Sequence, residues 1–503
     1  MMKCIKVMMK CIKKQQQICL VISSGLVLIA GYLGSSQDSI AKASTLQAAQ
    51  AQSCGQVSFT NTGIDVNSRS YALTTGDFDG DGKTDLATAN YFSGNTSDNV
   101  TILFLNENGG FDRSASYQFG ALPSAISAAD FNRDGKLDLA VCYSGSNTVD
   151  ILFNDGHGAF PRASAFAINN PRGLAVGDFN GDGSPDLAVT EFGSVYLWVI
   201  PVNGDGGFEP AERYIVGQDP ISVTAGDFNR DGRLDLATAN FSSSTISVLS
   251  NRGGGKFDTP VNYSVGGAPE SITLGDFNSD HKADLAVASA NTNAIWVYLN
   301  NPDGSSFQPP KIYPVGNVPT AVATTDLNLD GKDDLIVANL GDNTVFVLLN
   351  DRGHGFINTT TIRVGERPAA IAVGDFKADG KPDFAVANSG ATGVSVLLNT
   401  TICAPVISTV TTIQSSPNPS RAWHVVHFRI HVFAIEGRTV PTGKVQLLER
   451  GVPISPWLSL HAGKVKFSTN DFNADIHKIT ARYSGDALHQ PSSRQIWQVV
   501  YPR

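Results

Sequence analysis

Cysteine and histidine are scarce in this chain of 503 residues, which contains six cysteines and nine histidines. Six of the histidines follow residue 404, and the other three, His157, His281 and His354, lie in acidic loops or tight turns. The sequence has no Gly-x-Ser-x-Gly nucleophile signature, no zinc-protease motif and no P-loop. These absences argue against the commonest hydrolase and nucleotide-binding classes. They leave open catalysis by Tyr, Lys or Asp, as in a polysaccharide lyase.

Long apolar runs are equally few. Five lysines precede Ile18, and an apolar run then extends to Gly34, which is shorter than the ~20 residues of a membrane-spanning helix. Together with "AKA" at Ala41–Ala43, this pattern predicts a secretory signal peptide over residues 1–43. "AQA" at Ala49–Ala51 is the second candidate cleavage site, and an uncleaved anchor is the alternative. We expect a secreted or cell-surface protein without a membrane span in its mature chain.

Positive charge is also in short supply, because 37 Lys and Arg stand against 46 Asp and Glu. Loss of residues 1–43 would remove six lysines and one aspartate, which leaves 31 basic and 45 acidic residues and a net charge of −14. Nucleic-acid binding needs a basic surface. We therefore expect no nucleic-acid partner.

An acidic segment of nine residues recurs seven times. Its copies are "DFDGDGKTD" from Asp77, "DFNRDGKLD" from Asp130, "DFNGDGSPD" from Asp178, "DFNRDGRLD" from Asp227, "DFNSDHKAD" from Asp276, "DLNLDGKDD" from Asp326 and "DFKADGKPD" from Asp375. The steps between them are 53, 48, 49, 49, 50 and 49 residues. Such a constant period indicates a fold built from repeated units.

Each repeat has the pattern of four short strands. In the fourth copy the runs are "ISVTAGDF", "DLATANF", "TISVLSN" and "KFDTPVNYSV", between residues 221 and 265. They are β-branched or alternating, and Gly, Asn and Asp bound them, as expected of strands and hairpins. Four strands per ~50 residues, repeated seven times, predict an all-β fold, a seven-bladed β-propeller over residues 44–404.

The two ends of the repeat array complement each other. The seventh unit stops after three strands, whereas a spare strand at Gly55–Val66 precedes the first unit. We expect this strand to complete the seventh blade and leave no open edge. Cys54 and Cys403 flank these ends and are predicted to form a disulfide, with two unpaired thiols as the alternative. Cys142, in "LAVCY", is expected to be buried and free.

The acidic loop has the composition of a calcium site, since hard cations take about six to eight oxygen ligands. Positions 1, 3, 5 and 9 carry Asp or Asn in nearly every copy, and position 6 is Gly in six copies, which suits a positive φ. Position 7, usually Lys, can offer only its backbone carbonyl. The apolar residues at positions 2 and 10 are expected to anchor the loop.

The predicted side-chain ligands are Asp77, Asp79, Asp81, Asp85, Asp130, Asn132, Asp134, Asp138, Asp178, Asn180, Asp182, Asp186, Asp227, Asn229, Asp231, Asp235, Asp276, Asn278, Asp280, Asp284, Asp326, Asn328, Asp330, Asp334, Asp375, Asp379 and Asp383. The predicted carbonyl ligands are Lys83, Lys136, Ser184, Arg233, Lys282, Lys332 and Lys381. Two copies depart from the pattern, since His281 replaces the glycine and Lys377 puts a cation at a ligand position. Solvated Asp-rich turns are the alternative reading.

Between Cys54 and Cys403 the chain resembles the FG-GAP/VCBS repeats. The loops carry the resemblance, together with "NDGHGAF" (Asn154–Phe160) and "NPDGSSF" (Asn301–Phe307) between third and fourth strands. The family forms calcium-bearing propellers in integrin alpha chains and many secreted bacterial proteins. The resemblance implies this fold and calcium at positions 1, 3, 5 and 9. It implies no single reaction, because members include adhesion proteins, lectins and accessory domains of polysaccharide-degrading enzymes.

Residues 405–503 lack the period. "PTGKVQL" and "ITARYSGD" resemble bacterial Ig-like repeats, and the alternating runs predict a small β-sandwich without a cysteine. His427 and His431 share a strand face, but four residues at ~3.3 Å rise place them ~13 Å apart. One zinc ion therefore cannot bind both.

The face opposite the acidic loops is the predicted ligand site. Aromatic residues end the second strand in the first four units: Tyr91, Phe92, Tyr143, Phe192 and Phe241. Exposed aromatics there could stack on a carbohydrate or anchor a protein ligand; the alternative is that they turn inward and fill the core. The sequence predicts a monomeric recognition or adhesion module. A polysaccharide lyase or hydrolase, its accessory domain, and a structural surface spacer are the alternatives.

Overall fold

The computed structural model describes residues 22–23, 26–27, 57–66, 68–91, 99–301, 304, 306–351, 355–401, 409–435, 440–485 and 492–502. The chain divides into two compact units, Met1–Gln50 and Ala51–Arg503. In the first unit, β1 (Ile22–Ser23) pairs with β2 (Leu26–Val27) in an antiparallel hairpin. Within the described residues, no helix is both long and apolar enough to cross a membrane.

The repeats form seven antiparallel sheets of four strands each, which we call blades one to seven. Blade one is β4 (Arg69–Gly76), β5 (Asp85–Tyr91), β6 (Asn99–Leu105) and β7 (Phe111–Tyr117); blade two is β8 (Pro123–Ala129), β9 (Asp138–Tyr143), β10 (Thr148–Phe153) and β11 (Arg162–Ala167); blade three is β12 (Pro171–Gly177), β13 (Asp186–Glu191), β14 (Tyr196–Ile200) and β15 (Glu212–Ile215). Blade four is β16 (Pro220–Gly226), β17 (Asp235–Asn240), β18 (Thr245–Leu249) and β21 (Val261–Ser264), with a small hairpin of β19 (Asn251–Gly253) and β20 (Lys256–Phe257). Blade five is β22 (Pro269–Gly275), β23 (Asp284–Ser289), β24 (Ala294–Tyr298) and β25 (Lys311–Pro314), with the 3-10 helix η2 (Ala290–Thr292); blade six is β26 (Pro319–Thr325), β27 (Asp334–Asn339), β28 (Thr344–Asn350) and β29 (Phe356–Arg363). Blade seven is β30 (Pro368–Gly374), β31 (Asp383–Asn388), β32 (Val394–Asn399) and β3 (Phe59–Ile64).

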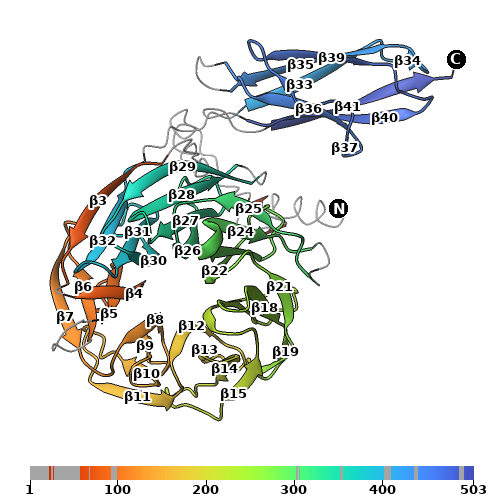
Figure 1. Cartoon of the computed structure of the whole chain (residues 1–503). Helices are drawn as coiled ribbons and strands as arrows, with labels where there is room; N and C mark the ends of the chain where they lie inside the picture. The colour runs from red at the N-terminus through yellow and green to blue at the C-terminus, as the bar shows by residue number, and fades with distance from the viewer. Residues whose placement is uncertain are drawn as a thin grey trace, which may run out of the picture. The chain divides into compact units, whose positions relative to one another are not determined.

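The blades close into a ring. The first strand of each blade is innermost, and these strands contact one another in the order β4, β8, β12, β16, β22, β26 and β30, with β30 returning to β4 (Figure 1). The N-terminal strand β3 pairs with β32, so that Phe59 lies opposite Asn399 and Ile64 opposite Val394. The prediction that this strand completes the seventh blade is confirmed. The ring therefore has no unpaired edge at its junction.

Apolar residues on either side of each acidic loop fill the space between blades. The position-2 side chains, six Phe and one Leu, are at most 3% exposed, and the position-10 side chains are fully buried. Phe78 of blade one packs with Leu139 and Val141 of blade two, for example. Burying one such side chain contributes roughly 1.5–3 kcal/mol. Their predicted role as anchors of the loop is confirmed.

Of the three cysteines after residue 43, only Cys142 lies in the described part of the chain. It is buried and free, as predicted. Cys54 and Cys403 lie outside the described residues, so their disulfide stays a prediction.

The C-terminal segment forms a small β-sandwich. One sheet contains β33 (Thr409–Ser416), β35 (Val426–Ala434) and β39 (Lys464–Thr469); the other contains β34 (Ser420–Arg421), β41 (Ser492–Tyr501), β40 (Ile476–Tyr483), β36 (Lys444–Glu449) and β37 (Val452–Pro453), and β38 (Leu458–Ser459) also pairs with β36. Val426, Phe428 and Ile430 of β35 are buried in the core. The alternate residues His427 and His431 are exposed, and the His427 Nδ1 atom lies 2.7 Å from Ser468 Oγ.

Candidate metal centres

Each acidic loop joins the first strand of a blade to the second. In blade one, β4 ends at Gly76, the loop begins at Asp77, and β5 begins with Asp85 at position 9. The other six blades repeat this placement, with position 1 directly after the innermost strand and position 9 first in the next strand. The seven loops are therefore equivalent hairpin connections.

The position-1 carboxylate organises the backbone of its own loop. Asp77 Oδ1 accepts hydrogen bonds from the amides of Gly80 (2.8 Å) and Asp81 (3.1 Å), and Asp77 Oδ2 accepts one from Gly82 (2.8 Å). The bond from position 6 to the position-1 Oδ2 recurs in all seven loops, at 2.7–2.9 Å. The Asp77 Oδ2 atom, which accepts one of these bonds, retains a lone pair for a cation.

Position 4 has a positive φ in every loop, as position 6 does, although five copies have a residue other than glycine there. Arg133 (φ 57°) and Leu329 (φ 56°) are examples. The sequence analysis identified this requirement only at position 6. The conformation strains an L-residue, and the hydrogen bonds to position 1 compensate for that strain.

The position-9 carboxylate is fully buried in every loop and ties the loop to the rest of its blade. Asp235 Oδ2 accepts the amide of Phe228 at position 2 (3.1 Å), and Asp235 Oδ1 accepts the amide of Asn251 at the end of the third strand (2.7 Å). The same pair of bonds is made by Asp85, Asp138, Asp186, Asp284, Asp334 and Asp383.

Burial raises the pKa of all seven position-9 carboxyls, because desolvation opposes their ionised form. The pKa rises to about 6 for Asp85, Asp138, Asp186, Asp235 and Asp383, to about 7 for Asp284 and to about 8 for Asp334. The loop carboxylates at positions 1, 3 and 5 add repulsion, for example Asp79 and Asp81 beside Asp85. A cation in the loop would offset both the desolvation of the position-9 carboxylate and the repulsion between the carboxylates.

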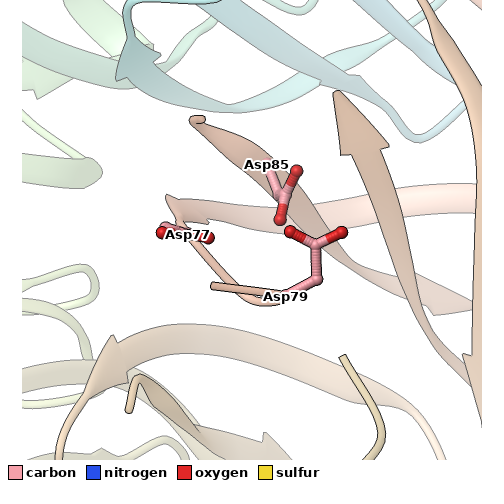
Figure 2. Close-up of side chains that lie close together, drawn as sticks. All are labelled: Asp77, Asp79 and Asp85. Carbon is pink, nitrogen blue, oxygen red and sulfur yellow. The ribbon is translucent and has the colours of Figure 1, made fainter. Parts of the chain in front are cut away.

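Three carboxylates of blade one converge as a metal site requires. Asp77, Asp79 and Asp85 each offer an oxygen, and these oxygens lie within 4.8 Å of one another. Figure 2 shows the Asp79 carboxylate facing that of Asp85 across the loop. Asp79 also forms an ion pair with Arg113 of β7. This arginine offsets the additional carboxylate that only this copy has at position 3.

Loop six offers the least compensated set of oxygens. Asp330 Oδ1 is buried without a hydrogen-bond partner among the described residues. Burial also raises the pKa of Asp326 and Asp330, and Lys332 is turned away to Ser279 Oγ (2.7 Å). An orphaned carboxylate oxygen beside two further carboxylates fits a hard divalent cation such as calcium.

The side chains at position 7 pair with position 5 in most loops. Lys83 Nζ lies 2.6 Å from Asp81 Oδ2, and Lys282 Nζ lies 3.2 Å from Asp280 Oδ2. Similar pairs join Lys136 to Asp134, Arg233 to Asp231 and Lys381 to Asp379. The position-5 Oδ1 of most loops accepts the position-7 amide, for example Lys83 N at 2.9 Å. The role of the position-7 carbonyl as a ligand stays a prediction.

Loop seven holds a cation of its own. Lys377 Nζ lies 3.1 Å from Asp379 Oδ2 and 4.0 Å from Asp383 Oδ1, and it donates to the Asn399 carbonyl. The ammonium group thus occupies the position among the carboxylates where a metal ion would sit. Asp375, Asp379, Lys381 and Asp383 were predicted as metal ligands, and the contacts of Lys377 argue against a metal ion in this loop.

Loop five tolerates its substitution. His281 has φ 63°, and its amide donates to Asp276 Oδ2 at 2.8 Å, as glycine does in the other loops. The His281 side chain is 91% exposed. The ligand arrangement of this loop is therefore preserved.

An asparagine after the third strand links neighbouring loops, and the sequence analysis missed it. In blade five, Asn300 Nδ2 donates to the carbonyl of Phe228 in the blade-four loop (2.7 Å) and to that of Ala283 in its own loop (3.1 Å). Asn154, Asn251, Asn350 and Asn399 make the same two bonds. The constant offset of 16 residues from position 9 could have revealed them. Val202 occupies this offset in blade three, and in blade one the residue that bonds to position 9 is Leu105, which stands 20 residues after Asp85.

The predicted aromatic ligand site needs correction. Tyr143 is fully buried and packs in the core between blades one and two, so it cannot contact a ligand. Tyr91, Phe192 and Phe241 are partly exposed, and Phe92 lies outside the described residues. Tyr143 stands five residues after its position-9 aspartate, whereas the other three stand six residues after theirs. Because strand residues alternate between faces, this one-residue difference turns Tyr143 inward.

Comparison with known families agrees with this geometry. The FG-GAP-like repeat matches residues 77–141, 130–189, 178–238, 232–287, 276–337 and 326–386, which together cover more than half of the chain. The chain belongs to the FG-GAP-like repeat family. Five of these matches begin at position 1 of an acidic loop, and the match from residue 232 begins at position 6. A bacterial Ig-like domain of group 3 matches residues 412–500, which confirms the assignment of the C-terminal sandwich.

Three solved structures that are similar to this chain have TM-scores below 0.5. BBS1N, from a complex with ARL6DN, has a TM-score of 0.49 at 13% identity, covering 71% of this chain and 99% of that chain. A proposed 6-phosphogluconolactonase from Bacteroides fragilis has a TM-score of 0.47 at 16% identity, covering 59% and 85%. The extracellular domain of a proposed one-component system from B. thetaiotaomicron has a TM-score of 0.42 at 10% identity, covering 88% and 60%. No curated protein matches the sequence significantly.

Proposed function

We propose that this FG-GAP-like protein is an exported recognition module whose propeller is stabilised by calcium ions in loops one to six. The observation that supports calcium most strongly is the buried position-9 carboxylate with its raised pKa, which recurs beside two or three further oxygen donors in each loop. Extracellular calcium modules bind with Kd on the order of 10⁻⁴–10⁻³ M. Such sites fill outside the cell and stabilise the fold by mass action.

The loop contacts explain how calcium would act on the whole ring. In blade four, position 1 follows the first strand, Asp235 begins the second strand, and its Oδ1 holds the end of the third strand. Asn251 then links this loop to the blade-three loop through the Phe179 carbonyl (2.9 Å). Neutralising one loop therefore stabilises three strands and one blade interface.

Recognition is assigned to the face opposite the acidic loops. The loops on the calcium side are occupied by their own hydrogen bonds, whereas Tyr91, Phe192 and Phe241 remain partly exposed where the second strands end. Partly exposed aromatics on a rigid scaffold suit a carbohydrate or protein ligand. The propeller is expected to act as a monomer at the cell surface or in the medium.

Thermal melting tests the calcium proposal. The protein should melt at a lower temperature in chelator, and added calcium should restore the original Tm. Asp227→Ala removes a position-1 ligand and should reduce the calcium-dependent gain, whereas Asp375→Ala in loop seven should not. Identical melting curves with and without chelator would contradict calcium stabilisation.

A glycan array, followed by turnover assays on any polysaccharide bound, tests the recognition proposal. Binding without turnover supports a recognition module. Turnover of a bound polysaccharide would instead make the protein an enzyme, and the absence of both would favour a structural spacer.

A further inference from the structure

Seven residues occupy equivalent positions on the innermost strands, which surround the axis of the ring, with one residue on each strand. Each stands at the register shift near the start of its strand, next to the residue that pairs with the end of the second strand. We call this set the bulge ring: Tyr71, Ser124, Arg172, Ile221, Glu270, Thr320 and Ala369. It lies at the end of the strands opposite the acidic loops, because those loops follow the other end of the same strands.

Arg172 is the one basic residue in the bulge ring. Its Nη1 atom lies 3.4 Å from the Tyr71 hydroxyl, although the two residues belong to blades three and one. Its guanidinium lies 5.3 Å from the centre of the Phe192 ring, which the sequence analysis placed on the ligand face. The arginine therefore reaches past blade two and crosses the region near the axis.

The hydrogen-bonding capacity of Arg172 is largely unused. Its Nε atom is buried without a hydrogen-bond partner among the residues that the structure describes. A guanidinium has five N–H donors arranged to bind a carboxylate through two parallel bonds. A buried donor without an acceptor is destabilising, so a ligand that supplies acceptors to this guanidinium gains affinity.

The neighbours of Arg172 restrict the anion that fits. Tyr71 is 40% exposed and offers both a ring face and a hydroxyl. Glu270, in blade five, is partly buried, and its charge is close enough to interact with that of Arg172. This carboxyl can accept hydrogen bonds from hydroxyl groups, and it repels a dianion such as phosphate more strongly than a single carboxylate.

We propose that the bulge ring binds the uronate unit of an acidic saccharide, with the sugar carboxylate on Arg172, its ring face on Tyr71 and a hydroxyl on Glu270. The proposal rests on the recognition function assigned above and names its ligand class. A saccharide suits the set because a half-exposed aromatic, a guanidinium and a carboxyl acceptor lie together around one axis.

Calorimetric titration of the full, calcium-loaded chain tests this site. The probes are short oligomers of galacturonate, glucuronate, mannuronate and guluronate, each paired with its methyl ester, with calcium in excess over the uronate. We expect at least one free acid to bind and its ester, which lacks the charge, to bind about tenfold more weakly or worse. Binding of no free acid, or equal binding of acid and ester, would overturn the proposal.

Matched variants separate the site from the fold. Arg172→Gln should weaken binding by about tenfold or more, and Tyr71→Ala by about three- to tenfold, whereas Tyr71→Phe should retain most of the affinity. Arg367→Gln changes an exposed arginine directly before β30, outside the bulge ring, and should bind like the wild type. The saccharide site would be refuted if Arg172→Gln bound uronates with full affinity. It would also be refuted if a glutamate-containing peptide bound more tightly than any uronate and this binding depended on Arg172.

Calcium-dependent melting, measured on the same variants, should match the wild type. If no uronate binds but neutral glycans bind on the array, the recognition function is supported and the uronate site is rejected. If melting is also insensitive to calcium, the proposed function itself fails.

Discussion

Replacing Lys377 with asparagine should convert loop seven from an ammonium-filled loop into a calcium site. Asparagine is the residue that five of the other six loops have at position 3. In calcium-free protein the change removes the ammonium that lies 3.1 Å from Asp379 Oδ2 and 4.0 Å from the fully buried Asp383. Hydrogen bonds to charged groups contribute about 1.5–3 kcal/mol, and Asp383 loses its nearest cation, so we expect a cost of about 2–4 kcal/mol.

Calcium should reverse this cost. At a free concentration of about 100 times Kd, one added site stabilises the native state by about 2.7 kcal/mol, which is close to the loss. Lys377→Asn should therefore melt below the wild type in chelator and near it in saturating calcium. Equilibrium dialysis should find one more calcium ion per chain than in the wild type.

Lys381→Asn is the matched control, because Lys381 Nζ also pairs with Asp379 Oδ2, at 3.5 Å, but position 7 offers only its carbonyl. This variant should not change the number of bound ions. If Lys377→Asn binds no additional calcium and gains no additional stability from it, the reading of Lys377 as a built-in cation is wrong.

Two further predictions follow from the loop contacts. Asn300→Ala should lower the free energy of unfolding by about 2–4 kcal/mol, since two buried carbonyls lose their donor. Val202→Asn should leave stability unchanged or raise it, because the new asparagine offers the missing link between blades two and three. Denaturant unfolding measures both variants, and equal effects would contradict the role of this asparagine in joining neighbouring blades. Burial raises the pKa of Asp235 to about 6 and that of Asp334 to about 8, above the unfolded value of 3.8. These carboxyls therefore stabilise the calcium-free fold when they are protonated. They lose that contribution as pH rises through 6–8. Calcium-stripped protein should thus melt higher at pH 5 than at pH 8, and the gain from calcium should be larger at pH 8; a gain that shrinks towards pH 8 would refute the role of burial.

Most of the fold could be predicted from the repeat period and the acidic loop. The position-9 aspartates predicted where each second strand begins, and the spare strand at Gly55–Val66 predicted the pairing of β3 with β32. The strand boundaries depend on local hydrogen bonds and on strand alternation, which a sequence displays directly. The pairing of β3 with β32 joins distant segments, and it was predictable because the seventh repeat lacks a fourth strand.

Features that depend on contacts between blades were harder to predict. Arg172 contacts Tyr71 across an intervening blade, although the two residues are 101 positions apart in the chain. No local sequence pattern predicts this contact. Asn300 bonds to Phe228, 72 residues earlier in the chain, although its constant offset from position 9 was visible. Tyr143 was wrongly placed on the ligand face because it stands one residue closer to position 9 than Tyr91, Phe192 and Phe241 do. A shift of one residue reverses the face of a strand.

Calcium stoichiometry tests the central claim most directly. Equilibrium dialysis of the purified chain against millimolar calcium, followed by metal analysis, counts the bound ions. The donor sets of loops one to six predict six ions per chain, with loop seven empty of metal because Lys377 occupies it. A chain that binds no calcium under these conditions would contradict the account.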